Sequence, residues 1–66
     1  MKINKERLLL AMAKKNINSF SELSEEANVS RQTLSYIKNG KTCSIKTLNA
    51  ISKALGVDVT EIIETD

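Results

Sequence analysis

Apolar residues recur along the chain at intervals of three and four positions, which is the spacing of one helix face. No run alternates apolar and polar residues as a half-buried strand does, so the pattern predicts an all-α protein. The first helix is predicted over residues 5–15, with Asn4 as its N-cap. Its wide apolar face consists of Leu8, Leu9, Ala11 and Met12, with Leu10 near the edge.

A second, short helix is predicted after a serine-rich entry. Ser19 and Glu22 fit a capping box at its start, and Leu23 and Ala27 face inward, four positions apart. The helix ends near Ala27 or Asn28. Because asparagine adopts the left-handed conformation more readily than other non-glycine residues, Asn28 indicates a sharp turn.

A third helix follows this turn at once. Ser30 is its N-cap, and Leu34 and Ile37 form its inward face. The Asn39-Gly40 pair follows a helical pattern and therefore marks the end of the helix.

A fourth helix is predicted between Ser44, its N-cap, and Gly56, its C-terminal stop. Its inward face consists of Ile45, Leu48, Ile51 and Leu55. The fifth and last helix is a stub with a capping box of Asp58 and Glu61, and Ile62 and Ile63 dock on the core.

Length and composition restrict the function. The 66 residues make one domain over 1–66, with one Cys, no His and two glycines. A single Cys and no His exclude an internal disulfide, the usual zinc sites and Ser-His or Cys-His pairs. We therefore expect no enzyme, no cofactor and no metal. The longest apolar run is residues 8–13, too short for a membrane span, and a cytoplasmic protein without a membrane partner is expected.

The net charge of +2 conceals a segmental pattern. Residues 1–15 carry a charge of +4, residues 16–30 carry −3 and residues 54–66 carry −4. The middle segment, residues 31–53, carries +5 and contains no acidic residue. This pattern indicates a surface that faces a polyanion, although five solvated cations on unrelated faces would give the same count.

Two stretches carry a resemblance to a known family. The first reads Leu23-Ser24-x-x-Ala27-Asn28-Val29-Ser30-x-x-Thr33-Leu34-Ser35-x-Ile37-x-Asn39-Gly40-Lys41. The second reads Leu48-x-x-Ile51-x-x-Ala54-Leu55-Gly56-Val57-x-x-x-x-Ile62. Together they resemble the helix-turn-helix and closing helices of the Cro and lambda-repressor family, the XRE-type regulators of phages and prokaryotes.

The resemblance implies a compact five-helix bundle of the lambda-repressor-like type that binds double-stranded operator DNA, usually as a homodimer. It implies base contacts in the major groove by Arg31, Gln32, Thr33, Ser35 and Tyr36. It implies phosphate contacts by Ser19, Ser21, Lys38, Asn39, Lys41, Ser44 and Lys46.

The chain departs from the family pattern at three places. Phe20 stands where many members carry a phosphate-binding glutamine, and the turn before it is one residue longer. Many members also pair an arginine on the first helix with a glutamate near the end of the third. Met12 and Lys38 occupy those positions here, so Lys38 is expected to face phosphate instead.

These features predict a transcriptional regulator, a repressor that blocks a pseudo-palindromic operator. The alternative is a protein-interaction module, such as an antitoxin or antirepressor partner with the same fold. A partner protein could also regulate the chain. Tyr36 could pack beside Leu34 instead of contacting bases, and Cys43 is expected to be a partly buried loop residue. The expected dimer surface consists of Val59, Ile62 and Ile63. One leucine of residues 8–10, if exposed, could also join a partner surface.

Overall fold

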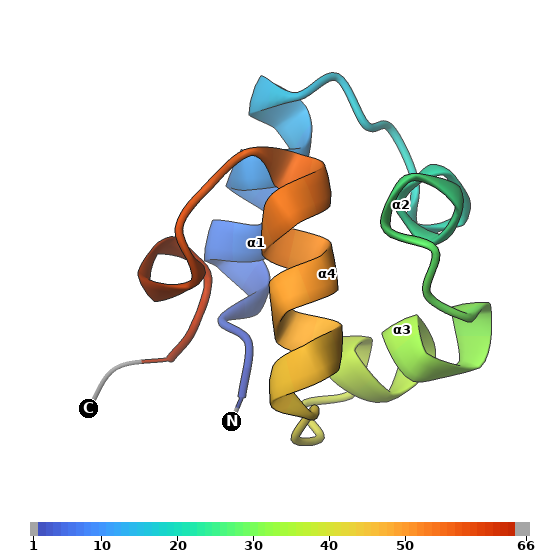
Figure 1. Cartoon of the computed structure of the whole chain (residues 1–66), viewed down its shortest axis with the longest axis vertical. Helices are drawn as coiled ribbons and strands as arrows, with labels where there is room; N and C mark the ends of the chain where they lie inside the picture. Colours follow the sequence, from blue (N-terminus) through green and yellow to red (C-terminus); the bar gives the residue numbers. More distant parts are fainter. Residues whose placement is uncertain (1, 65–66) are drawn as a thin grey trace.

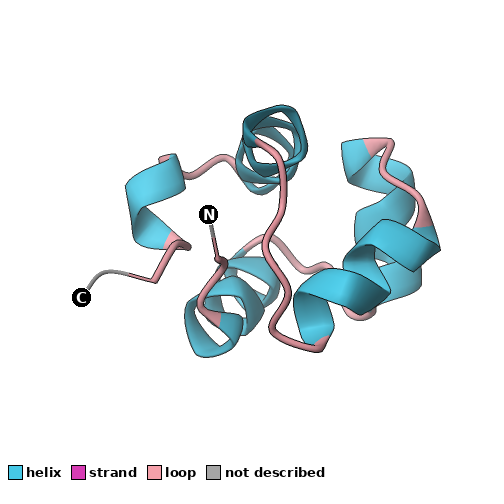
Figure 2. Ribbon diagram, turned by 90° about the horizontal axis from the view of Figure 1, so that it is seen from below, coloured by secondary structure: helices cyan, strands magenta, loops and turns pink. Residues whose placement is uncertain are grey.

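The computed structural model describes residues 2–64. Over this range the chain forms four α-helices and one 3-10 turn: α1 (Lys5–Lys14), α2 (Phe20–Ala27), α3 (Arg31–Lys38), α4 (Ile45–Leu55) and η1 (Val59–Glu61). α4 overlaps α1 in the view of Figure 1, but Figure 2 shows these two helices apart, on opposite sides of the molecule. The α2–α3 pair lies on one side of them and η1 on the other (Figures 1 and 2). None of these helices combines the length and hydrophobicity that crossing a bilayer requires.

The predicted N-caps are confirmed at all four helices. The side chains of Asn4, Ser19, Ser30 and Ser44 each accept a hydrogen bond from the backbone N–H three residues on. Each such cap contributes about 1 kcal/mol, so the serines set the helix starts in a chain too short for long helices. The capping box predicted at α2 forms only in part, because the Glu22 carboxylate accepts from the backbone of Asn18 instead of Ser19.

One hydrophobic core joins all five elements. Its most deeply buried side chains are Leu8, Leu23, Leu34, Leu48, Ile51 and Ile62. Two residues predicted for the core are exposed instead: Leu9 and Ile45, at 43% and 66%. Leu9 lies beyond the side of α1 that packs on the core. Ile45 is the first residue of α4, and a side chain there is directed back toward the helix N-terminus, beyond the turns that pack on the core.

The prediction of a fifth helix is wrong. The capping box of Asp58 and Glu61 is present, but only the three-residue 3-10 turn η1 follows it. The chain then leaves helical geometry because its backbone pairs with the first residues of the protein (Figure 2). Ile3 and Ile63 form an antiparallel bridge, and the Asn4 N–H donates to the Ile62 carbonyl at 2.7 Å. The described chain therefore has four of the five expected helices, and a clasp between its two ends stands in place of the fifth.

Candidate nucleic-acid interface

The turn between α2 and α3 sets the angle at which α3 is presented. Asn28 has φ +55°, the left-handed conformation that the sequence predicts. Two hydrogen bonds close the turn: the Val29 N–H donates to the Ser24 carbonyl at 3.0 Å, and the Ser24 hydroxyl donates to the Val29 carbonyl. The second bond is a local contact that helical periodicity does not reveal. The turn is therefore held at both sides of Asn28.

Packing fixes the rotation of α3 about its own axis. Leu34 and Ile37 are buried at 1% and 4% exposure, as predicted, and α3 packs against α2. Because a helix turns 100° per residue, the remaining positions are directed away from the core. Four of the five predicted base-contacting side chains are exposed: Arg31, Gln32, Ser35 and Tyr36. The structure brings these together on one outer face of α3.

Thr33 differs from the other four. It is half-buried, and its backbone N–H donates to the Ser30 hydroxyl at 3.2 Å. The two hydroxyl groups of Ser30 and Thr33 lie 2.8 Å apart and are hydrogen-bonded. Thr33 therefore contributes to the cap of α3, which orders the helix start that Arg31 and Gln32 occupy.

Gln32 and Tyr36 form a pair on the outer face. The Gln32 Nε2 donates to the Tyr36 Oη at 3.3 Å across one helical turn. Tyr36 is 48% exposed, so it is not a side chain enclosed beside Leu34. This hydrogen bond restrains the amide of Gln32, which is an exposed residue. The pair is thus an oriented polar surface rather than two freely moving side chains.

A hollow of about 190 Å³ lies at the seam between α2 and α3. Its lining consists of Phe20, Ser21, Arg31, Leu34, Ser35 and Lys38. The Lys38 Nζ lies 5.7 Å from the centre of the Phe20 ring, within the range of a cation–π contact. Phe20, which stands where many family members carry glutamine, therefore interacts here through its aromatic ring. It draws the Lys38 ammonium toward α2, beside two hydroxyl groups and a guanidinium.

The loop after α3 carries the second group of predicted phosphate contacts. The Lys41 N–H donates to the Tyr36 carbonyl at 3.0 Å, which holds the loop against the end of α3. Asn39, Lys41 and Lys46 are exposed. Ser19 and Ser44 are exposed but act as caps, since their hydroxyl groups accept from the backbone of Glu22 and Thr47 at 3.2 Å each.

Ile45 lies within this group although the sequence pattern places it in the core. It is exposed and sits between Ser44 and Lys46 at the start of α4. An exposed aliphatic side chain beside cations can contact a thymine methyl group or a sugar. The sequence signal that could have revealed it is its position directly after the N-cap.

Cys43 lies in the same loop and is half-buried, as predicted. Burial raises the pKa of its thiol above the ordinary value. A raised thiol pKa disfavours the reactive thiolate at neutral pH. The surroundings of Cys43 therefore lower the reactivity of its thiol.

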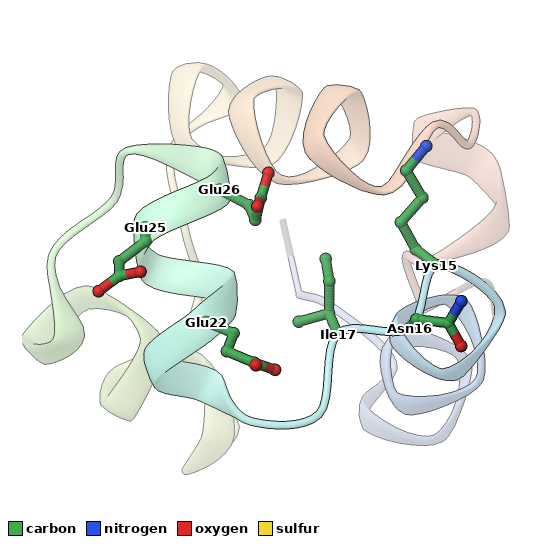
Figure 3. A pocket seen from close by; sticks show the side chains of 6 residues that line it. All are labelled: Lys15, Asn16, Ile17, Glu22, Glu25 and Glu26. Carbon is green, nitrogen blue, oxygen red and sulfur yellow. The ribbon is translucent and has the colours of Figure 1, made fainter.

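A second hollow, of about 270 Å³, lies between the end of α1 and α2. Its lining consists of Lys15, Asn16, Ile17, Glu22, Glu25 and Glu26 (Figure 3). The Glu22 side chain points toward Ile17 across the hollow, whereas Glu25 points away from it. Glu22 and Glu26 repel phosphate, and Lys15 is the one cation in this lining, so this hollow is a poorer phosphate site than the seam that carries Phe20 and Lys38.

Comparison with known proteins identifies the family. A family profile described as a Cro/C1-type HTH DNA-binding domain matches residues 7–66, which is nearly the whole chain. No curated protein and no solved structure matches the chain.

Proposed function

The chain belongs to the Cro/C1-type HTH DNA-binding domain family, and we propose that it is a sequence-specific transcriptional regulator. The observation that carries the proposal is the outer face of α3. Exposed hydrogen-bonding side chains lie there in a stretch of chain that has no carboxylate between Glu26 and Asp58. A helix of this kind fits the major groove of B-DNA, and its first residues reach the base edges.

Within this proposal, the first turn of α3 reads bases. Arg31 donates to guanine O6 and N7, and Gln32 pairs with adenine N6 and N7. The hydrogen bond from Gln32 to Tyr36 supports this role, because it orients the amide before DNA arrives. Ser35 and Tyr36 contact the next bases along the groove. Thr33 offers a methyl group to thymine while its hydroxyl stays with the cap.

Phosphate contacts flank the recognition helix on two sides. One set lies at the seam of α2 and α3, where Lys38 is held beside the Phe20 ring and Ser21. The other set lies in the exit loop and the first turn of α4. The proposed phosphate contacts are Ser19, Ser21, Lys38, Asn39, Lys41, Ser44 and Lys46. At the capping serines, phosphate would be bound by the backbone N–H groups at the start of the helix as well as by the serine hydroxyl groups.

A dimer completes the proposed mechanism. The longest extent of one chain is 28 Å, which is less than the roughly 34 Å between successive major grooves on one side of DNA. One copy therefore covers one half-site. Two copies on a pseudo-palindromic operator would reach the affinity that a regulator needs, and would repress by excluding the polymerase.

Selection of bound sites from random DNA duplexes tests the proposal. We expect enriched sites with two-fold symmetry and half-sites about 10 base pairs apart. Arg31→Ala is expected to weaken binding by roughly 10-fold or more and to relax the preference at one position of each half-site. Lys53→Ala is the control, because it removes one cation at the far end of α4 and is expected to weaken binding far less (Figure 1).

The same experiment distinguishes the alternative function. A protein-interaction module would enrich no sequence and would bind DNA with the same affinity as its Arg31→Ala variant. Such a result would overturn the proposal and favour a partner protein as the ligand of α3.

A further inference from the structure

The Phe20 ring has a fixed place at the start of α2. Phe20 is the first residue of this helix, and its half-buried side chain packs against the core. Lys38, the last residue of α3, is exposed, and its Nζ lies 5.7 Å from the centre of the ring. Because lysine carries its charge on a flexible four-carbon stem, the ring is the fixed partner and the ammonium is the mobile one. The contact therefore restricts where the ammonium lies before any ligand binds.

The surroundings of this ammonium suit an anion. The lining of the hollow at the seam of α2 and α3 includes two cations, those of Arg31 and Lys38, and no carboxylate. The two cations are seven positions apart, so they lie on the same side of α3, about 10 Å apart along its axis. Ser21 and Ser35 add two hydroxyl groups to the lining. No negative charge in this lining neutralises the Lys38 ammonium.

The ring also decides which helix end the ammonium is near. Lys38 lies in the last turn of α3, where the helix dipole and the terminal carbonyl groups attract a cation. The contact with Phe20 instead places its Nζ over the first residue of α2. Backbone N–H groups at a helix start favour an anion. A phosphate at this point would therefore meet the ammonium and the start of α2 together.

We propose that Phe20 is a positioning residue for DNA binding: its ring holds the Lys38 ammonium at the start of α2, where the ammonium binds one phosphate of the DNA backbone. The inference rests on the proposed function and adds to it a residue that is not itself a phosphate contact. A lysine that is already restrained loses less freedom when it binds. Since an exposed cation–π contact is weak, we expect the ring to raise the affinity for DNA about two- to fivefold.

Substitution of the ring tests this contribution. The affinity for a duplex with a single half-site is measured at low salt by fluorescence anisotropy. Phe20→Leu keeps an apolar side chain against the core and is expected to weaken binding about two- to fivefold. Phe20→Tyr keeps a ring and is expected to change the affinity by less than about 1.5-fold. Thermal unfolding curves set a temperature at which every variant is folded. Tighter binding by Phe20→Leu would overturn the proposal, because it would mean that the ring keeps the ammonium away from DNA.

A double-mutant cycle distinguishes positioning of Lys38 from support of the fold. In a Lys38→Ala background, Phe20→Leu is expected to change the affinity by less than about 1.5-fold, because no ammonium is left to position. Lys41→Ala is the control background, since it removes a cation of the exit loop instead. There, Phe20→Leu is still expected to weaken binding about two- to fivefold. Equal losses in the two backgrounds would overturn the proposal.

Nuclear magnetic resonance reports the contact itself, with and without DNA. Protons above an aromatic ring are shielded, so we expect the ε-methylene protons of Lys38 to resonate at higher field in the unchanged chain than in Phe20→Leu. The difference is expected to persist in the half-site complex. Its loss when the duplex is added would overturn the proposal, because the ammonium would then have left the ring.

The positioning role and the proposed function fail in distinguishable ways. If the unchanged chain binds no half-site duplex, the proposed function fails and the positioning role fails with it, even where the free chain shows the shielded protons. If the unchanged chain binds the half-site, and Arg31→Ala weakens that binding, but Phe20 and Lys38 show no coupling, the positioning role alone is wrong.

Discussion

The two isoleucines of α4 differ in how deeply their side chains are buried. Ile51 is fully buried, whereas Ile45 is 66% exposed beside the loop that we propose contacts DNA. Spacing by threes assigns both to the core, because Leu48 lies three positions from each of them. Six positions nevertheless place the two side chains about 120° apart around α4, and Ile45 is also the first residue of the helix.

The same conservative substitution at both positions measures this difference. We expect Ile51→Val to lower the free energy of unfolding by about 1 kcal/mol, since one buried methylene is lost. Ile45→Val is expected to change it by less than about 0.5 kcal/mol, as at other surface positions. Urea unfolding followed by circular dichroism gives both values, and a similar loss at Ile45 would show that this side chain packs against the fold.

Cys43 gives a prediction with a pH dependence. Burial raises the pKa of its thiol, so the folded chain holds this proton more tightly than the unfolded chain. The corresponding stabilisation is complete below the unfolded thiol pKa of about 8.5 and is lost as the pH rises through the folded value. We expect alkylation at pH 8 to be slow in the folded protein and several-fold faster in urea. The two rates would be equal if the loop left the thiol in water.

At the scale of elements, the turn between α2 and α3 depends on one backbone conformation. Asn28 has a positive φ, which costs most side chains about 1 to 2 kcal/mol. We expect Asn28→Ala to destabilise the protein by about 1 kcal/mol and Asn28→Gly to change it by less than about 0.5 kcal/mol, since glycine adopts this conformation without strain. Thermal unfolding distinguishes them. Equal effects of the two substitutions would mean that the Asn28 side chain, and not its backbone, supports the turn.

Elements were predictable from the sequence where the determining contacts are local. The caps at Ser19, Ser30 and Ser44 each depend on a partner three residues away, and all are present. The prediction of a fifth helix was wrong because the structure of this segment depends on pairing between Ile3 and Ile63, which are sixty positions apart. The cation–π contact of Lys38 with Phe20 could likewise not be predicted from the sequence, since it depends on how α3 packs on α2. Sequence reasoning therefore located the outer face of α3 but not the seam beside it.

At the scale of the whole molecule, the small net charge is the sum of opposed surfaces. The cations from Arg31 to Lys46 lie on or beside α3, and the carboxylates of α2 line a hollow next to α1. Such a distribution orients the molecule toward a polyanion as it approaches, although its total charge is only +2.

Salt dependence measures how many of these cations contact phosphate. For a half-site duplex, we expect the double change Lys41→Ala with Lys46→Ala to reduce the slope of log affinity against log salt by about 2, close to one per phosphate contact. The control pair Lys5→Ala with Lys53→Ala removes the same charge elsewhere and is expected to leave the slope within about 0.5 of its original value. Equal reductions by the two pairs would mean that only overall charge matters.

The clasp between residues 2–4 and residues 62–64 has a kinetic consequence. It joins parts of the chain that are sixty positions apart, so closing this loop is entropically unfavourable until the helices have packed. We therefore expect the clasp to form after the rate-limiting step of folding. Stopped-flow measurements on Ile3→Ala are expected to show faster unfolding and a nearly constant refolding rate, and a slower refolding rate would mean that the clasp forms early. The lifetime of the native state, more than the speed of reaching it, depends on this small contact.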